Sequence, residues 1–403
     1  MELFWLEHKK LWRKKIVKIC VLLCFVYCVI FGSILSFQWF CFGSSDDYTS
    51  AFGNNFDGYT VIKDSQEYAL SFGGELTDET LQKIVSNYQQ MKADGMEEEL
   101  EKTDWQIVNS WLGTLYPELR DTSNYKTMIS YVDPDKLTGF YERRQQVLDE
   151  FLEVSGQVGA EKEFLHQIER KVEKPFRYEW VEGWSTLLGS TVADLGVVMA
   201  LFLGIVLSSL FAGEWHDNTS TLVLTTRNGW GKIALAKILT GLAFTVELFA
   251  LLAVSSVISQ LFFMGTAGWD MPIQNIKLIA VAPMNMLQAE IYEYAFVLLG
   301  AIGFAGIVMF ISAAVKNNVL TLLLSLAVVY GPMMIAEYLP YKMQKALDLI
   351  PLVGSSTDIF RTNTFRILGK LIWSPYLLIT IPVLIGILCM PFAIKSWSRR
   401  MKA

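Results

Sequence analysis

Long apolar runs alternate with polar segments along this chain of 403 residues. A run of about 20 apolar residues can cross a bilayer as a helix, and such runs cover residues 19–40, 188–212, 238–264, 292–315, 319–337 and 375–393. A longer polar stretch, residues 43–183, separates the first run from the second and has the length of an ordinary domain. The pattern predicts an all-α polytopic membrane protein with six transmembrane helices and one polar domain.

The polar domain, residues 43–183, is expected to be mainly helical with minor β-structure. Thr77 has the sequence context of a helix cap, because Asp78 and Glu79 follow it in the first turn. Apolar residues then recur at helical spacing, at Leu81, Ile84, Val85 and Tyr88. These positions predict an amphipathic helix.

Two further helices are expected in this domain. Asp133-Pro134 predicts the start of one. Its apolar stripe consists of Leu137, Phe140, Tyr141, Leu148 and Phe151. Another helix is expected over residues 161–172, before Pro175. His166 is the only histidine of the domain, and on so charged a helix we expect it to be a solvent-exposed surface residue.

The beginning of the chain predicts an interfacial helix followed by the first span. In residues 1–15, Phe4, Leu11 and Trp12 lie at helical spacing among lysines, so this segment is expected to lie in the cytosolic interface of the membrane. Residues 16–42 contain an apolar core that is too long for a signal peptide, and we expect them to stay in the membrane as an anchor.

Basic residues favour one orientation. The cluster before the first run, Arg227 with Lys232, Lys316 and the C-terminal tail fall on the same side of the predicted membrane. The positive-inside bias identifies that side as the cytoplasm. Six spans then place both termini there and residues 43–183 outside.

Residues 338–374, before the last span, carry basic residues on the outer side and are an exception to this bias. The segment is too polar to span and too apolar to be a free loop. We expect short helices that dip into the outer leaflet and are buried against protein.

Composition agrees with a membrane protein and argues against an enzyme. The chain is 52% hydrophobic and 18% charged, and its net charge of −6 combines an acidic polar domain with a basic remainder. Cys20, Cys24 and Cys28 line one face of the first span, where cysteine is an ordinary small apolar residue. The sequence has no GxxxxGK[ST], GxSxG, HExxH or CxxC motif. We expect no catalytic residues, no metal, no bound cofactor and no nucleic acid.

One compact polar segment, residues 211–237, joins the second and third runs. Glu214 ends the preceding run, and Lys237 lies at the start of the next. Residues 219–226 place Leu222 among hydroxyl residues, which predicts a short helix or strand with one apolar face. A few residues would be enough to turn the chain, so we interpret this segment as a surface held by a cytosolic partner.

Two carboxylates fall inside predicted spans. Glu247 lies near the middle of the third span and Asp194 near the outer end of the second. Ionisable groups within a bilayer are costly and usually face a cavity or a partner. Each is therefore either a substrate or proton contact in a translocation pathway, or a hydrogen-bonded structural residue at a helix interface. Glu290 and Glu293, at the outer mouth, are expected to be ordinary interfacial residues.

Small residues recur at every fourth position along the second span, at Gly196, Ala200, Gly204 and Ser208. Glycines also thin the fourth span, at Gly300, Gly303 and Gly306. Such stripes let two helices approach closely. We favour helix packing within the chain over a seam between two copies.

Together these features resemble the membrane subunit of a type-2 ABC exporter. That family combines an amphipathic cytosolic helix, six spans, a polar segment between the second and third, and a semi-buried loop before the sixth. Its polar segment reads approximately F-x-x-E, then G-T, leucines, a basic residue and a lysine at the next span. The matching residues here are Phe211, Glu214, Thr219, Leu222, Leu224, Arg227 and Lys237, and Glu7 and Lys10 match the family's N-terminal Glu and Lys. Asn218 stands where the family has glycine; a helix can still start there, because asparagine caps well.

The resemblance implies a permease in the bacterial plasma membrane. Two such subunits, identical or homologous, pair among membrane lipid, and two copies of a separate ATPase dock on a coupling loop, residues 213–232. ATP and Mg²⁺ are then bound by the partner, whose closure moves the loop and the spans. Permeases of low-GC Gram-positive bacteria with a large domain after the first span are often linked to peptide antibiotic export or resistance. The substrate implied is an amphipathic peptide or lipid-like molecule.

Two other functions stay open at this point. One is a non-transporting membrane sensor or scaffold whose acidic domain binds a peptide or cell-wall ligand and signals inward. The other is a six-span protein associated with phage infection or secretion. An ATPase gene beside this one, or a co-purifying ATPase, would favour the exporter.

Overall fold

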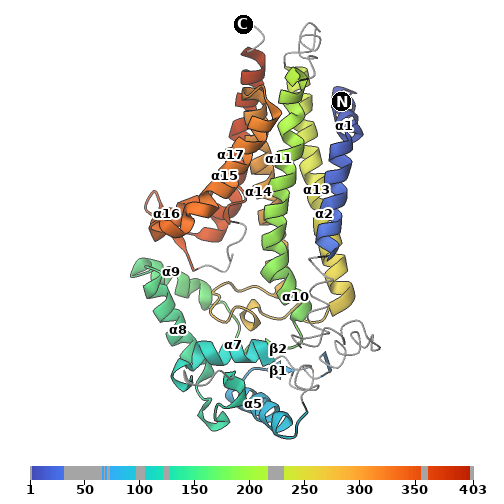
Figure 1. Ribbon diagram of the computed structural model, residues 1–403. Coiled ribbons are helices and arrows are strands. Elements are labelled where there is room, and N and C mark those ends of the chain that lie inside the picture. Colours follow the sequence, from blue (N-terminus) through green and yellow to red (C-terminus); the bar gives the residue numbers. More distant parts are fainter. Residues whose placement is uncertain are drawn as a thin grey trace, which may run out of the picture.

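The structure, a computed structural model, describes residues 2–30, 66–67, 69, 73–96, 105–120, 127–216, 231–354 and 362–399. These residues are mostly helical with little sheet. Figure 1 shows a bundle of long helices with a group of shorter helices, α5 to α9, beyond one end. We call this group the α5–α9 domain. The opposite end of the bundle, where α1 and the end of α17 lie, is called the α1 end.

Five helices are long and apolar enough to cross a membrane, which indicates a membrane protein. They are α11 (Val192–His216), α13 (Lys232–Met264), α14 (Met286–Ala314), α15 (Asn318–Ile335) and α17 (Ser374–Arg399). They overlap five of the six predicted runs. The first run begins in α2 (Lys15–Val29), but residues 31–40 lie outside the described part, so a sixth span stays a prediction.

Local sequence explains where several long helices begin. The side chain of Asn285 accepts a hydrogen bond from the N–H of Gln288 at 2.8 Å, and the Gln288 side chain accepts one from the N–H of Asn285 at 3.2 Å. This capping box starts α14. Asn317 starts α15 by accepting hydrogen bonds from the N–H groups of Val319 and Leu320.

α14 and α17 pack at a very short distance because of glycine. A Cβ atom at Gly303 would overlap the carbonyl group of Pro382, and one at Gly306 would overlap the backbone of Gly386. Only glycine leaves room for backbones this close. The glycines of the fourth predicted span therefore allow close packing of α14 against α17 of the same chain.

The α5–α9 domain has the predicted mainly helical character. Its elements are β1 (Gly74–Glu75), α5 (Asp78–Ala93), α7 (Trp105–Leu115), α8 (Phe140–Val154), α9 (Ala160–Glu169) and β2 (Arg177–Tyr178). β1 and β2 pair antiparallel. The cap at Thr77 is confirmed, since its hydroxyl accepts the N–H of Thr80 at 3.2 Å. The predicted apolar stripe of α5 is buried in the domain core.

The predicted helix start at Asp133-Pro134 is wrong. Pro134 opens a short 3₁₀ turn, Pro134–Lys136, in which the Asp133 carboxylate accepts the N–H of Asp135. Gly139 then has a left-handed φ of 71°, so α8 begins only at Phe140. The predicted stripe also fails at Phe151, whose side chain is 42% exposed.

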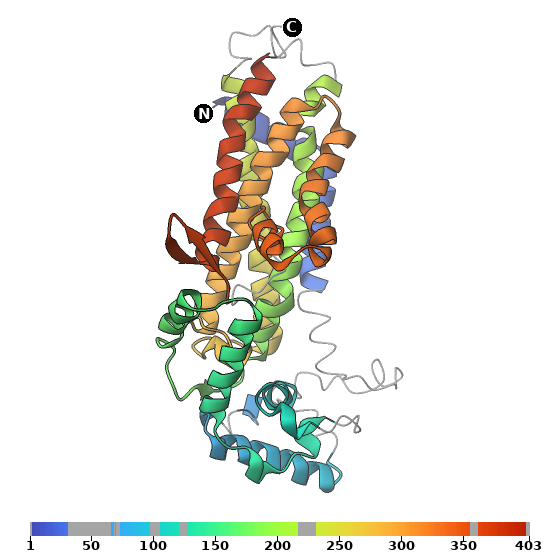
Figure 2. The ribbon, with the colours of Figure 1, turned by 90° about the vertical axis from the view of Figure 1, so that its left-hand side faces the viewer.

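The segment before α17 is partly buried and contains a hairpin that was not predicted. α16 (Tyr341–Leu347) is followed by Leu352 and Val353, which are buried in the core of the bundle. β3 (Thr364–Ile367) and β4 (Lys370–Trp373) then form an antiparallel hairpin. Figure 2 shows the hairpin at the side of the bundle, next to α9.

The connection between α13 and α14 contacts the α5–α9 domain. This loop, residues 265–285, includes a 3₁₀ turn, Ile273–Asn275. The short helix α10 (Glu182–Thr186) and a π-helical turn, Leu187–Thr191, lead from the domain into α11. The side chain of Trp111 donates a hydrogen bond of 3.0 Å to the backbone oxygen of Asn275 in the loop.

Candidate functional site

A partly buried ion-pair network joins three helices at the α1 end. α1 (Glu2–Arg13) supplies Glu7 and Lys10, α11 supplies Glu214, and α13 supplies Lys237. One oxygen of Glu214 accepts hydrogen bonds from Lys10 Nζ at 2.5 Å and Lys237 Nζ at 2.7 Å. Lys237 Nζ also donates to Glu7 Oε2 at 2.7 Å. We call these four residues the α1–α11–α13 network.

Helix geometry explains why these residues meet. Glu7 and Lys10 are three positions apart and therefore share one face of α1. Glu214 lies in the last turn of α11, and Lys237 in the second turn of α13. The side chains of Glu214 and Lys237 are only 3% and 2% exposed, so each needs the opposite charge of the other.

Two further contacts fix the end of α11. The Ser312 hydroxyl of α14 donates to the backbone oxygen of Ser208 at 2.7 Å and accepts the N–H groups of Phe211 and Ala212 at 3.1 Å. The ring of Phe211 also packs edge-on against Trp397 of α17. The helix end that carries Glu214 is therefore held from α1, α13, α14 and α17.

The remaining predicted coupling residues, Thr219, Leu222, Leu224 and Arg227, lie outside the described residues. The described parts of the segment are its two ends, in α11 and α13, and both lie at the α1 end (Figure 1). The network thus surrounds the two points where the segment leaves and re-enters the bundle.

Glu247 faces α1. Its carboxylate accepts a hydrogen bond of 3.0 Å from Trp12 Nε1 and lies 3.2 Å from His8 Nε2. The side chain is 43% exposed. This geometry fits the alternative of a hydrogen-bonded residue at a helix interface. The backbone of Asp194 lies in the first turn of α11, and its side chain is outside the described residues.

The stripe of small residues on α11 faces other helices of the same chain. Gly196, Ala200, Gly204 and Ser208 are all buried. A Cβ at Gly204 would lie 3.2 Å from Leu326 of α15, and the backbone oxygen of Ser208 accepts the hydroxyl of Ser312 in α14. Through these contacts the small residues of α11 pack against α14 and α15.

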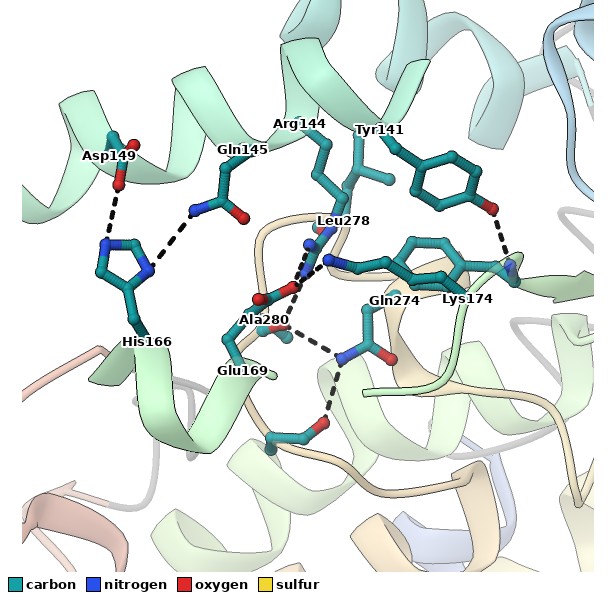
Figure 3. Close-up of polar contacts among 12 residues, drawn as sticks. Tyr141, Arg144, Gln145, Asp149, His166, Glu169, Lys174, Gln274, Leu278 and Ala280 are labelled. Atoms are coloured by element: carbon teal, nitrogen blue, oxygen red, sulfur yellow. Dashed lines mark hydrogen bonds and ion pairs between the residues drawn. The ribbon is translucent and has the colours of Figure 1, made fainter. Parts of the chain in front are cut away.

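A second buried network joins the α5–α9 domain to the loop of residues 265–285 (Figure 3). Arg144 of α8 is fully buried and donates to Glu169 Oε1 of α9 at 2.6 Å. Its other guanidinium nitrogens donate to the backbone oxygens of Leu278 at 2.7 Å and Ala280 at 3.1 Å. Lys174 Nζ lies 2.8 Å from the same Glu169 oxygen. We call Arg144, Glu169 and Lys174 the Arg144 network.

The charges of this network control the ionisation of Glu169. Burial by itself would raise the pKa of Glu169, but the hydrogen bonds and charges of Lys174 and Arg144 outweigh it and hold the pKa below its ordinary value. Burial lowers the pKa of Arg144, and Glu169 opposes that shift. The pair is therefore charged at neutral pH.

His166 is not the solvated residue that we expected. Its Nε2 lies 2.8 Å from Asp149 of α8, its Nδ1 lies 3.4 Å from the Gln145 amide, and the side chain is 18% exposed (Figure 3). The charge pattern of α9 could not predict these contacts of His166, because Asp149 and Gln145 belong to the neighbouring helix α8.

A cavity of about 350 Å³ lies at the same junction. Its lining combines the end of the α5–α9 domain, including Lys171, Glu173 and Arg177, with the loop residues Asp270 and Gln274. Both signs of charge and a buried amide thus line one space.

Sequence reasoning missed two buried carboxylates. Glu290 and Glu293 were expected to be ordinary interfacial residues, but both are buried in the bundle. Their spacing of three residues in α14, on one face of a long apolar helix, was the available signal.

When the chain is compared with known proteins, no family model, no curated protein and no solved structure matches it. The resemblance to type-2 exporters therefore rests on the residues named above and stays a prediction.

Proposed function

We propose that the chain is the membrane-spanning permease subunit of an ATP-driven ABC exporter in the bacterial plasma membrane, with six spans and both termini in the cytoplasm. The observation that carries this proposal is the α1–α11–α13 network. Glu7, Lys10, Glu214 and Lys237 match separate positions of the family pattern, and in the fold they meet at one point. A convergence of this kind is what a coupling joint requires.

The network also suggests how coupling would work. Glu214 and Lys237 lie at the two ends of the segment that we propose as the coupling loop, and Glu7 and Lys10 attach α1 to them. An ATPase that pulls on the loop would therefore move α1, α11 and α13 together. ATP and Mg²⁺ would be bound by the partner.

The test is co-purification with an ATPase, combined with charge changes in the coupling segment. The full chain, tagged and purified from bacterial membranes, is expected to retain an ABC ATPase. Leu222→Arg and Glu214→Arg are expected to lose it, while Arg170→Glu, on the exposed surface of the α5–α9 domain, should keep it. Size-exclusion profiles of the variants exclude misfolding. Retention of the ATPase by both Leu222→Arg and Glu214→Arg would show that the segment is not the docking site.

The proposed substrate is an amphipathic peptide or lipid-like molecule, moved outward. Cells that lack the chain are then expected to secrete less of such a peptide or to become more sensitive to it. An unchanged phenotype across a panel of membrane-active peptides would remove this substrate class.

The cavity at the α5–α9 junction favours a second candidate, a sensor that binds a peptide or cell-wall ligand and signals inward. Its mixed lining of Lys171, Glu173, Arg177 and Asp270 suits a zwitterionic peptide segment. A ligand that binds the purified chain without stimulating ATP hydrolysis by a co-purified partner would favour this candidate over the exporter.

A further inference from the structure

Two buried polar side chains without hydrogen-bond partners occupy α13 and α14. Gln260 of α13 is fully buried, and Glu290 of α14 is 3% exposed. The amide nitrogen and oxygen of Gln260 and both carboxylate oxygens of Glu290 lack a hydrogen-bond partner in the described part of the chain. Leaving such groups unsatisfied inside a protein is costly. Their presence indicates that something else satisfies them.

The register of the two helices brings these side chains to the same level. Tyr294 of α14 and Ser256 of α13 are hydrogen-bonded through their hydroxyls at 2.9 Å. The loop that joins α13 and α14 lies at the α5–α9 end, so the helices run in opposite directions (Figure 1). Gln260 follows Ser256 by one helical turn in α13, and Glu290 precedes Tyr294 by one turn in α14. Both therefore lie one turn closer to the α5–α9 end, on the same helix faces as the hydrogen-bonded pair. The Tyr294 hydroxyl is close enough to Glu290 for the two to interact electrostatically.

The balance of hydrogen-bond donors and acceptors in this region indicates which kind of ligand fits. The Ser256 hydroxyl donates to the backbone oxygen of Ala253 at 3.0 Å, so it accepts the proton of Tyr294. The Tyr294 hydroxyl also lies within hydrogen-bonding reach of Glu290, and its single proton can serve only one of these two partners. The facing sides of the two helices then offer four oxygens, two from Glu290 and one each from Gln260 and Tyr294, against the two N–H donors of the Gln260 amide and one phenol proton. An excess of oxygen acceptors around one negative charge suits a cation.

We propose that Gln260, Glu290 and Tyr294 form a buried binding site for one monovalent cation, either a small metal ion such as sodium or an ammonium group. One carboxylate balances one positive charge. No lysine, arginine or histidine among the described residues pairs with Glu290. Clusters of three or more acidic, histidine or cysteine residues, which multivalent metals favour, are also absent from the described residues. The site does not depend on an ATPase partner, so the purified chain is sufficient to test it.

The experiment measures thermal unfolding of the purified full chain in detergent while sodium chloride or ammonium chloride replaces choline chloride at constant ionic strength. A ligand that binds only the folded state stabilises it in proportion to the logarithm of its concentration. We expect a saturable rise of the melting temperature with sodium, ammonium or both, and none with choline. The ion that acts identifies the source of the cation.

Variants separate the site from general salt effects. Glu290→Gln is expected to lose the cation response and to be at least as stable as the parent in choline, because it removes an unpaired buried charge. Gln260→Leu is expected to weaken the response at least tenfold in concentration. Glu293→Gln, a matched control on the same helix whose carboxylate has a polar interaction, should keep it.

Two results would overturn the proposal. One is a parent chain that sodium and ammonium stabilise no more than choline does, which would leave the carboxyl protonated or hydrated. The other is a cation response that persists unchanged in both Glu290→Gln and Gln260→Leu. Either result would leave the proposed exporter function untouched.

Discussion

The two ion-pair networks, at opposite ends of the bundle, have different cations at their centres: Arg144 in one and Lys237 in the other. The Arg144 network holds the α5–α9 domain with a guanidinium group that binds one carboxylate and two backbone oxygens in fixed directions. The α1–α11–α13 network uses two lysines, which are compact charges on flexible stems. An arginine fork holds one geometry, whereas a lysine can follow a moving carboxylate. The comparison teaches that one joint is built to be rigid and the other to tolerate movement.

Truncating the arginine should have the largest effect. Arg144→Ala leaves Glu169 with Lys174 as its remaining partner and removes the donor of the Leu278 backbone oxygen, and breaking a buried pair in this way costs about 3–5 kcal/mol. We expect a lower melting temperature and faster hydrogen exchange in α8, α9 and the loop of residues 265–285. The matched control is Arg170→Ala, which breaks an exposed pair with Glu163 and should cost less than about 1 kcal/mol. Equal effects of the two variants would contradict the rigid joint.

Removing the central lysine should cost less. Lys237→Met leaves Glu214 with Lys10 as its remaining partner in the network, so we expect a loss of about 2–4 kcal/mol. Hydrogen exchange should increase in α1 and leave the α5–α9 domain unchanged. Lys232→Met, at the exposed first residue of α13, is the control and should have no measurable effect. Increased exchange in α8 or α9 would show that the two joints are not independent.

Exchanging arginine for lysine tests the difference between the two cations directly. Arg144→Lys keeps the charge and its pairing with Glu169 but cannot also reach the oxygens of Leu278 and Ala280. We expect a loss of about 2 kcal/mol, most of it as faster exchange in the loop. A variant as stable as the parent would mean that the fixed directions of the guanidinium contribute nothing.

Acid should loosen the Arg144 network by a smaller amount. The pKa of Glu169 lies below its ordinary value of 4.5 in the folded protein, so its contribution is complete at neutral pH and is lost as the pH falls below that value. Arg144 keeps its two backbone acceptors throughout, which limits the loss. Hydrogen exchange in α9 is expected to accelerate in this acid range, and Glu169→Gln should abolish the pH dependence. Persistence of the same dependence in Glu169→Gln would place its origin elsewhere.

Glu247 should give the smallest effect. Glu247→Gln keeps an oxygen that can accept the Trp12 hydrogen bond, and the side chain is already half-exposed. We expect less than about 1 kcal/mol in thermal unfolding and no change in the exchange of α1. A large loss of stability would show that its contact with His8 and Trp12 belongs to the buried joint.

Features that depend on local sequence could be predicted. The long apolar runs and the cap at Thr77 are properties of neighbouring residues, and both are found in the structure. The start of α8 was missed because it depends on a distant residue: the Asp78 carboxylate binds the N–H groups of Gly139 and Phe140 at 2.7 and 2.9 Å. No periodicity within residues 133–140 carries that information.

The candidate sites show the same limit. Glu7, Lys10, Glu214 and Lys237 could be selected by their pattern, but nothing in that pattern indicated that they touch one another. Arg144 could not be selected at all. It lies in a charged helix and looks like a surface residue until the loop of residues 265–285, more than a hundred positions later, supplies its two oxygens.

α13 extends from the α1–α11–α13 network to the end of the bundle that faces the α5–α9 domain. Its 33 residues extend about 50 Å, well beyond the roughly 30 Å of a bilayer core. Lys237 lies near one end, and at the other end the backbone oxygen of Met264 accepts a hydrogen bond of 3.2 Å from Trp180. A helix is stiff along its axis, so α13 can transmit an axial displacement from one of its ends to the other. A displacement of Lys237 along the helix axis would then reach Met264 and its contact with Trp180.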